Sequence, residues 1–329
     1  MKVLITAPGN VITQKLLPEL FAPEFSVRII APNPYQLPEA VRQQAEIIRG
    51  SMEDADLLRR ALEEVEAMFW VFPRESVQER NIPAHYERFA RVAATVVREA
   101  GTPRVVAISA WDKGPGKNAD RFDRLRATED ILNQSGAAIR HVRQAWLMEN
   151  FLTKIHSIEH RGLISYPVAG DIPVPMTAAA DVADVALRWL ARRNWADVEG
   201  ACVHGPEDLT FTGAAAVFER VLHRPVRYEE ISPERHIQTL VDSGASNEYA
   251  QEEIAMFGQF AARSAEEKGN GIQSNAPTTL DAWARSELLP LLAPITPQIA
   301  PGSNSASFRP MADPPQSSRF QFRNLAMSP

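Results

Sequence analysis

Three side chains in this sequence could hold or move a proton beside a small organic substrate. Ser109 ends an apolar run that starts at residue 103, Asp112 follows it by three positions, and Tyr86 stands three positions after Pro83. Hydroxyl and carboxyl groups are common general acids and bases. Each residue also has an ordinary structural role, as a strand-end cap, a solvated loop charge or a surface residue at a helix start. We favour the cap for Ser109, and all three stay catalytic candidates.

The N-terminal stretch could bind a phosphate group. Val3, Leu4 and Ile5 form an apolar run with β-branched members, which is typical of a buried parallel strand. A turn at Pro8 and Gly9 and then a helical pattern follow this run. Where a strand leads directly into a helix, the first helical amides point toward any anion beyond them. The pattern therefore predicts a place for a dinucleotide pyrophosphate at this turn.

The other positions of a dinucleotide fingerprint are altered. Such turns usually carry three glycines, for the tight turn, for close approach of the ligand and for helix packing. Only Gly9 is present, because Ala7 and Ile12 stand at the other two places. The strand predicted at 26–31 is followed by neither the acidic residue of NAD sites nor the arginine of NADP sites, although Asn33 could bond a ribose. An ordinary turn without a ligand is the alternative.

An alternation of strands and helices must position these residues. Apolar strands are predicted at 3–5, 26–31, 45–50, 67–73, 103–110 and 138–142, with amphipathic helices at 54–65 and 81–100. This order predicts an α/β fold with a doubly wound, Rossmann-like parallel sheet and a smaller C-terminal α/β lobe. Ligands bind beyond the carboxyl ends of such strands, so the loop at 111–119 is a candidate wall of the active site.

The chain divides into three parts. We expect a Rossmann-like domain at 1–150, a substrate-binding lobe at 151–296, and a disordered Pro- and Ser-rich tail at 297–329. Segments near 176–205 can return to the first domain. Trp146, Leu147, Met148 and Phe151 form an apolar cluster that is either core or pocket lining, and we favour core.

Composition excludes several classes of protein. The 329 residues are 45% hydrophobic, as in ordinary globular proteins, and the net charge of −6 argues against a nucleic-acid surface. No run is apolar enough to cross a membrane, and no signal peptide precedes the first strand. The lone Cys202 favours a cytoplasmic protein. Scattered histidines without a cysteine pair predict no metal site, and the oligomeric state stays open.

A succession of short segments carries a family resemblance. The segments are Arg104–Ser109, Ala127–Glu129 with Ser135–Gly136, Val142–Arg143, Met148–Asn150, Ala180–Ala186, Gly205–Thr210 and His223–Tyr228. In this order they resemble the signatures of the NmrA-like family, an atypical branch of the short-chain dehydrogenases/reductases. The resemblance implies a dinucleotide-binding domain closed by a small substrate lobe. Members include NAD(P)H-dependent reductases of quinones and related compounds, and regulators that bind a dinucleotide without turning it over.

The resemblance also implies which residues contact each ligand. Cofactor contacts are expected at Thr6, Gly9, Asn10, Val11, Asn33, Ser51, Phe72 and Pro73. Substrate contacts are expected at Trp111, Trp146, Met148, Asn150 and Phe151. The sequence departs from the family at Pro32, where an arginine is common, at Ser51, where an aspartate is common, and at Gln144, where a proline is common. No tyrosine has a lysine four positions later, so the proton-transfer pair of ordinary short-chain dehydrogenases is absent.

Three functions stay open on these grounds. The first is reduction of a quinone or a small conjugated carbonyl compound with NADPH or NADH, because the cofactor itself carries the hydride chemistry. The second is a cofactor-independent cyclase, isomerase or dehydratase that uses the same fold, since the departures fall on cofactor-contacting positions. The third is a dinucleotide sensor without catalysis.

Overall fold

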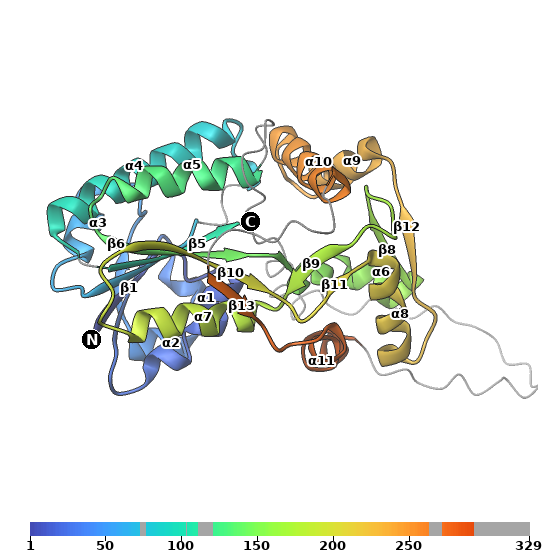
Figure 1. The fold of residues 1–329 in the computed structure, drawn as a ribbon, viewed down its shortest axis with the longest axis horizontal. Helices are drawn as coiled ribbons and strands as arrows, with labels where there is room; N and C mark the ends of the chain where they lie inside the picture. Colours follow the sequence, from blue (N-terminus) through green and yellow to red (C-terminus); the bar gives the residue numbers. More distant parts are fainter. Residues whose placement is uncertain (73–76, 103, 111–120, 263–271, 293–329) are drawn as a thin grey trace, which may run out of the picture.

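The computed structural model describes residues 1–72, 77–102, 104–110, 121–262 and 272–292. Its centre is an eight-stranded sheet in the order β13-β10-β6-β5-β4-β1-β2-β3, and every strand pair in it is parallel (Figure 1). The strands are β1 (Lys2–Ile5), β2 (Ser26–Ala31), β3 (Glu46–Arg49), β4 (Ala67–Trp70), β5 (Arg104–Ala110), β6 (Ala138–Gln144), β10 (Val198–His204) and β13 (Ile272–Asn275).

Helices cover both faces of this sheet. On one face lie α1 (Val11–Leu16), α2 (Glu39–Gln44) and α7 (Ala179–Ala191), and on the other α3 (Ala55–Ala61), α4 (Ile82–Ala100) and α5 (Arg121–Asn133) (Figure 1). Alternate residues of one strand feed two cores, since Val3 and Ile5 pack with α1 and α7 while Leu4 packs with α3 and α4. The predicted doubly wound parallel sheet is confirmed.

Local chemistry sets where the helices begin and end. The side chain of Asn81 accepts from the Ala84 amide at 3.2 Å and starts α4, and Gly101, with φ of 64°, ends it. These bounds match the helix predicted at 81–100. The first helix, α1, stops at Leu16, before Pro18, because proline lacks the amide that continues a helix.

The later part of the chain builds a second region around its own core. Its strands form a three-stranded sheet, β11-β9-β7, and a pair, β12-β8. The strands are β7 (Trp146–Leu147), β8 (Leu163–Tyr166), β9 (Val174–Thr177), β11 (Asp208–Leu209) and β12 (Arg227–Glu230). The helices are α6 (Ile155–Arg161), α8 (Phe211–Leu222), α9 (Pro233–Asp242), α10 (Asn247–Ala262) and α11 (Leu280–Trp283). Short 3-10 helices include η2 (Pro34–Gln36) and η4 (Met148–Lys154), and a π-helical turn, η5 (Ala284–Leu288), follows α11.

Two strands from this later part extend the main sheet. β10 pairs with β6, and β13 pairs with β10 at the edge. We therefore propose that both belong with the N-terminal domain, and that the rest of 151–292 forms the substrate lobe. The tail expected at 297–329 lies outside the described residues. Within the described part of the chain, no helix combines the length and the apolar character needed to cross a membrane.

Candidate functional site

The order in which the chain adds strands to the sheet reverses between β1 and β4, and such folds bind ligands at this switch point. β1 lies between β2 and β4, and the chain runs outward through β2 and β3 before it returns to β4. Thr6 fastens the two strands at this point. Its buried hydroxyl accepts from the Val71 amide at 3.1 Å and lies 3.3 Å from the carbonyls of Phe69 and Val71. Open parallel sheets take ligands beyond the carboxyl ends at such a switch point.

The turn after β1 presents Gly9 at an exposed tip. Asn10 is buried beside it, and its side chain accepts from the Ile12 amide at 2.9 Å and caps α1. Val11, the first residue of α1, is also buried. The φ of Gly9 lies outside the left-handed region, and no atom lies within 4 Å of a Cβ built on it. Neither backbone conformation nor packing therefore requires glycine at this position.

The two altered fingerprint positions lie inside the protein. Ala7 is 6% exposed and Ile12 is fully buried, and both belong to the core that the sheet forms with α1 and α7. Ile12 is thus directed into the core and leaves the tip at Gly9 open. The side chains that replace the two fingerprint glycines therefore pack in the core and do not block the turn.

The polar side chains after β2 and β3 are engaged locally. The Asn33 side chain accepts from the Tyr35 amide at 3.2 Å, and the Ser51 hydroxyl accepts from the Glu53 amide at 3.2 Å. Beside Asn33, Tyr35 is 80% exposed. An aromatic ring on open surface beyond β2, the neighbour of β1, could stack on a base. A tyrosine four positions after the end of β2 is the sequence signal for it.

The structure brings Phe72 and Tyr86 together. Their ring centroids are 4.3 Å apart at 70°, and each side chain is 2% exposed. Trp70 and Phe89 extend this aromatic cluster at the carboxyl end of β4 and the start of α4. Tyr86 therefore packs in the core between the two elements and does not lie on the surface.

Ser109 belongs to a buried polar cluster across β5, β6, β10 and α5. The strand register pairs it with Arg143, and pairs Arg143 with Cys202. Two nitrogens of Arg143, Nε and Nη2, donate to the two carboxylate oxygens of Glu129 at 3.0 and 2.6 Å. A Cβ on Gly200 would lie 2.6 Å from Nη1 of Arg143, so glycine there lets the guanidinium rest against β10.

The electrostatics of this cluster favour a permanent ion pair. Burial is the largest single effect on the pKa of Glu129 and raises it, but the hydrogen bonds and charge of Arg143, the charge of His141 and the hydrogen bond from Ser109 together hold this pKa below its usual value. Burial raises the pKa of the Cys202 thiol, which disfavours a reactive thiolate. Burial also lowers the pKa of His141, whose Nε2 lies 2.8 Å from the Asn133 side-chain oxygen.

The apolar residues expected to contact substrate lie in the core of the C-terminal lobe. Met148 and Phe151 are fully buried, and Trp146 is 7% exposed with its ring 4.8 Å from that of Phe151. Asn150 is half-buried, and its carbonyl accepts from the Tyr166 hydroxyl at 3.2 Å. Pro73, Trp111 and Asp112, the remaining predicted site residues, lie outside the described residues.

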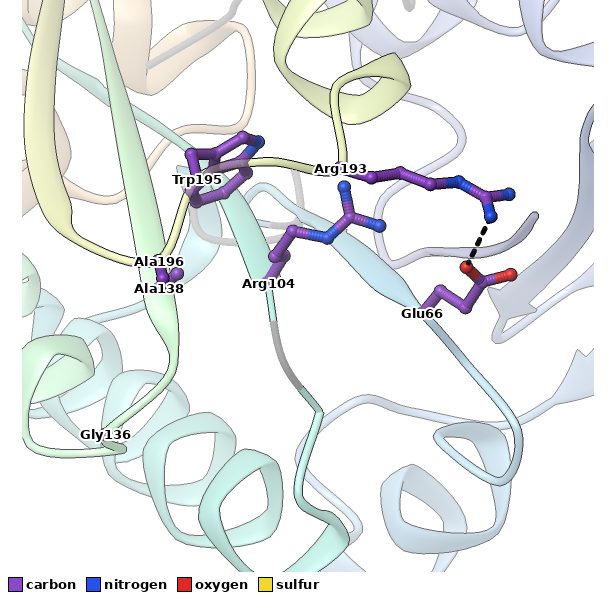
Figure 2. A pocket seen from close by; sticks show the side chains of 7 residues that line it. All are labelled: Glu66, Arg104, Gly136, Ala138, Arg193, Trp195 and Ala196. Carbon is purple, nitrogen blue, oxygen red and sulfur yellow. Dashed lines mark ion pairs between the residues drawn. The ribbon is translucent and has the colours of Figure 1, made fainter.

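A hollow of about 410 Å³ lies at the opposite, amino edge of the sheet (Figure 2). Arg104 and Ala138, the first residues of β5 and β6, line it together with Trp195, and Arg193 pairs with Glu66 at 3.7 Å. It is therefore remote from Gly9 and Ser109.

The arginines near this hollow have structural partners. Arg140 lies 4.5 Å from the Trp189 ring and 4.6 Å from the Trp195 ring, and it pairs with Asp197 at 2.6 Å. Arg104 donates to the carbonyl of Arg192. These contacts anchor the segment before β10, so we assign the hollow no part in the predicted site.

Comparison with known proteins gives one family and several neighbours. The model of the NmrA-like family matches residues 2–284. A (4-alkanoyl-5-oxo-2,5-dihydrofuran-3-yl)methyl phosphate reductase of Streptomyces griseus is 31% identical over 234 residues, covering 70% of this chain and 77% of that protein.

Two solved structures share the fold at low identity. An NADPH-dependent quinone oxidoreductase of Escherichia coli, complexed with NADPH, is 19% identical with a TM-score of 0.67, over 87% of this chain and 99% of that chain. NmrA, a negative transcriptional regulator in complex with NADP, is 17% identical with a TM-score of 0.67, over 88% of this chain and 95% of that chain.

Proposed function

Because this chain belongs to the NmrA-like family, we propose that it binds a nicotinamide dinucleotide and reduces a small conjugated carbonyl compound or a quinone. The sequence after β2 does not select between NADPH and NADH, since neither an acidic residue nor an arginine directly follows this strand. Reduced nicotinamide would supply the hydride, and the chain would bind, orient and shield the reactants.

The observation that carries this proposal is the open tip at Gly9. Among the described residues, only Gly258 shares its two properties, a φ outside the left-handed region and no atom within 4 Å of a Cβ. The fold itself therefore gives no reason for glycine at position 9. Unlike Gly258, Gly9 lies between β1 and the start of α1, where close approach of a ligand to the backbone would account for it, as for the middle glycine of dinucleotide turns.

The surrounding residues fit a dinucleotide laid across the switch point. The turn at Gly9 and the start of α1 would receive the pyrophosphate through backbone amides. Beyond β2, Tyr35 would stack on the adenine, and Asn33 would reach a ribose only if its bond to the Tyr35 amide opened. Phe72 would border the nicotinamide from the end of β4. Thr6, Asn10 and Val11 would shape the turn, and Ser51 and Pro73 complete the proposed contacts.

The relative from Streptomyces griseus supports the proposed substrate class. The name of the Streptomyces griseus enzyme describes a ring double bond conjugated with carbonyl groups, which is an electrophile suited to hydride addition. We propose that the substrate of this chain also contains a conjugated carbonyl group, with substituents that can differ. Trp146, Met148 and Phe151 form part of the core of the proposed substrate lobe, and Trp111 and the half-buried Asn150 are the proposed contacts nearest to the substrate.

Reduction also needs a proton or a hydrogen-bond donor for the substrate oxygen. Ser109 is our proposed donor because it stands at the carboxyl end of β5, beside β4, and Asp112 is the other proposed group. Tyr86 would reach the substrate only if its packing against Phe72 opened. The Arg143–Glu129 pair would hold Ser109 in place without entering the chemistry.

The test compares two glycine variants of the full chain. Gly9→Val would fill the open tip, and Gly258→Val is the matched control on α10. NADPH or NADH at millimolar concentration should raise the melting temperature of the parent and of the control, because a ligand of the folded state stabilises it. Gly9→Val should melt like the parent without dinucleotide and show no shift with it. If neither dinucleotide shifts the parent, the cofactor proposal is wrong.

A non-redox enzyme on the same fold is the second candidate. The observation behind it is the local engagement of Asn33 and Ser51, whose side-chain oxygens both bond nearby backbone amides. It predicts no dinucleotide shift but turnover of a conjugated carbonyl without reductant. Dinucleotide binding without consumption of reduced nicotinamide across quinones and enones would indicate a sensor instead.

The proposal also covers the cell compartment and the binding partners. We propose a cytoplasmic enzyme of small-molecule metabolism, in line with a single, buried cysteine. A net charge of −6 gives no support for a nucleic-acid partner.

A further inference from the structure

Three side chains with metal-binding atoms meet on α6, outside the proposed dinucleotide site. They are His156, Glu159 and His160, and one ligand atom from each lies within 4.8 Å of the others. The two imidazole rings have centroids 4.3 Å apart, and Nε2 of His160 lies 3.4 Å from Oε2 of Glu159. α6 lies beside β8 in the C-terminal lobe (Figure 1).

The spacing explains why these residues meet. Positions three and four apart lie on one face of a helix, so the second histidine and the glutamate both neighbour His156. The sequence prediction of no metal site rested on the scattered histidines and the missing cysteine pair. It did not weigh a histidine pair with a glutamate at helical spacing.

We propose that His156, Glu159 and His160 form a site for one divalent transition-metal ion of the zinc class. Two imidazoles and a carboxylate are a common ligand set for such ions, with bonds of about 2.0–2.2 Å that place ligand atoms about 3.3 Å apart. Binding would require the side chains to rotate until the present separations, up to 4.8 Å, reach that value. Water would take the remaining positions.

The surroundings of α6 hold the ligands in register. Gly162 ends the helix with φ of 56°, and a Cβ there would lie 2.2 Å from the Pro225 carbonyl, so this junction admits no larger residue. Arg224 donates to the Glu159 carbonyl at 3.0 Å, and the Arg227 amide donates to the Gly162 carbonyl at 2.9 Å. The last helical turn is thus fixed before any ion binds.

Exposure and charge favour a cation at this place. The His160 side chain is 55% exposed and the Glu159 side chain 26% exposed, so an ion can enter without a rearrangement of the core. Glu159 brings a carboxylate to the two imidazoles, and this set of donor atoms favours a positively charged ligand.

The ligand set also predicts selectivity. Imidazole binds Cu²⁺, Ni²⁺ and Zn²⁺ well, whereas Mg²⁺ and Ca²⁺ prefer sites made wholly of oxygen.

The experiment is titration of the untagged full chain with ZnCl₂ by calorimetry, with MgCl₂ as the comparison salt. His156→Gln and His160→Gln test the site, and His223→Asn is the control because His223 is also exposed and its left-handed φ of 52° suits asparagine. We expect one Zn²⁺ per chain, binding weakened about ten-fold or more in each test variant, and no change in the control.

Either of two results would overturn the proposal: no Zn²⁺ binding by the parent, or equal binding by the parent and both test variants. The exposed positions of the substitutions keep the variants folded, which unchanged melting temperatures without metal would verify. None of these residues belongs to the proposed dinucleotide site, so this test stands or fails separately from the reductase proposal.

Discussion

At the scale of single residues, the Glu129–Arg143 pair holds two charges where water is almost absent. The side chains are 6% and 12% exposed, and the closest contact between them is 2.6 Å. A buried charge that loses its partner pays the full cost of desolvation, whereas a pair replaced by apolar side chains does not. The stability of this part of the sheet therefore depends on both residues together.

Removing one partner should cost far more than removing an exposed charge. We expect Glu129→Leu and Arg143→Met each to lower the free energy of unfolding by about 3–5 kcal/mol, and the double variant to lose much less than the sum. Urea unfolding of the four proteins measures this coupling. The same cycle at Glu87 and Arg91, a pair 50% and 60% exposed on α4, should show coupling below about 1 kcal/mol. Additive losses at 129 and 143 would contradict the role assigned to the pair.

Residue types alone could locate only part of the site. Gly9 was predictable as the turn residue, since a strand, a glycine and a helix follow one another within a dozen positions. The Glu129–Arg143 pair was not, because its members lie 14 positions apart on a helix and a strand that meet only in the folded sheet. The burial of Tyr86 also needed the structure, because it depends on Phe72 from another element.

At the scale of elements, α7 begins without a cap from its own sequence. Its N-cap residue, Ala178, has no side chain that could accept, and Glu149 from η4 takes this role across 30 positions. The Ala179 amide donates to the two carboxylate oxygens at 3.1 and 3.0 Å, and Nε1 of Trp283 donates to one of them at 3.1 Å. Glu149 thus joins η4, α7 and α11.

This contact predicts a pH dependence of stability. Burial raises the pKa of Glu149 from 4.5 to about 7. Below pH 4.5 the carboxyl is protonated in both states, and as the pH rises toward 7 only the unfolded state releases its proton. The stabilising contribution is therefore complete below 4.5 and lost as the pH passes through about 7, a change of about 3 kcal/mol.

The variant Glu149→Gln isolates this effect because it keeps the size and an acceptor but cannot ionise. The free energy of unfolding of the parent, minus that of the variant, should fall by about 3 kcal/mol between pH 4.5 and pH 8. Urea unfolding at several pH values gives this difference. Other titrating groups cancel, since both proteins contain them. A difference that stays constant across the range would show that Glu149 ionises freely.

At the scale of the whole molecule, residues 272–292 tie the C-terminal lobe to the main sheet. β13 pairs with β10, and the chain then passes into α11 and η5, whose Trp283 and Leu288 lie in the core of the lobe. On the way, Thr278 bonds Asp181 of α7. The alternation of strands and helices predicted the sheet, but β13 has one apolar residue in four and is set by its place beside β10, which no local pattern reveals.

The clasp between Asp181 and Thr278 should control how easily this segment opens. Asp181 accepts from the Thr278 amide at 3.1 Å and from its hydroxyl at 2.8 Å, and it is 5% exposed. Asp181→Ala would leave both donors without an acceptor, whereas Asp184→Ala, at an exposed position of the same helix, removes a charge but no such bond. Hydrogen exchange measured by mass spectrometry should therefore become about ten-fold faster in peptides covering 278–288 of Asp181→Ala, because local opening sets exchange there.

Peptides from β1 and β4 should be unchanged, and Asp184→Ala should match the parent throughout. Equal acceleration in every peptide would mean that Asp181 supports the whole fold, and no acceleration at 278–288 would mean that the lobe is held by its apolar core alone.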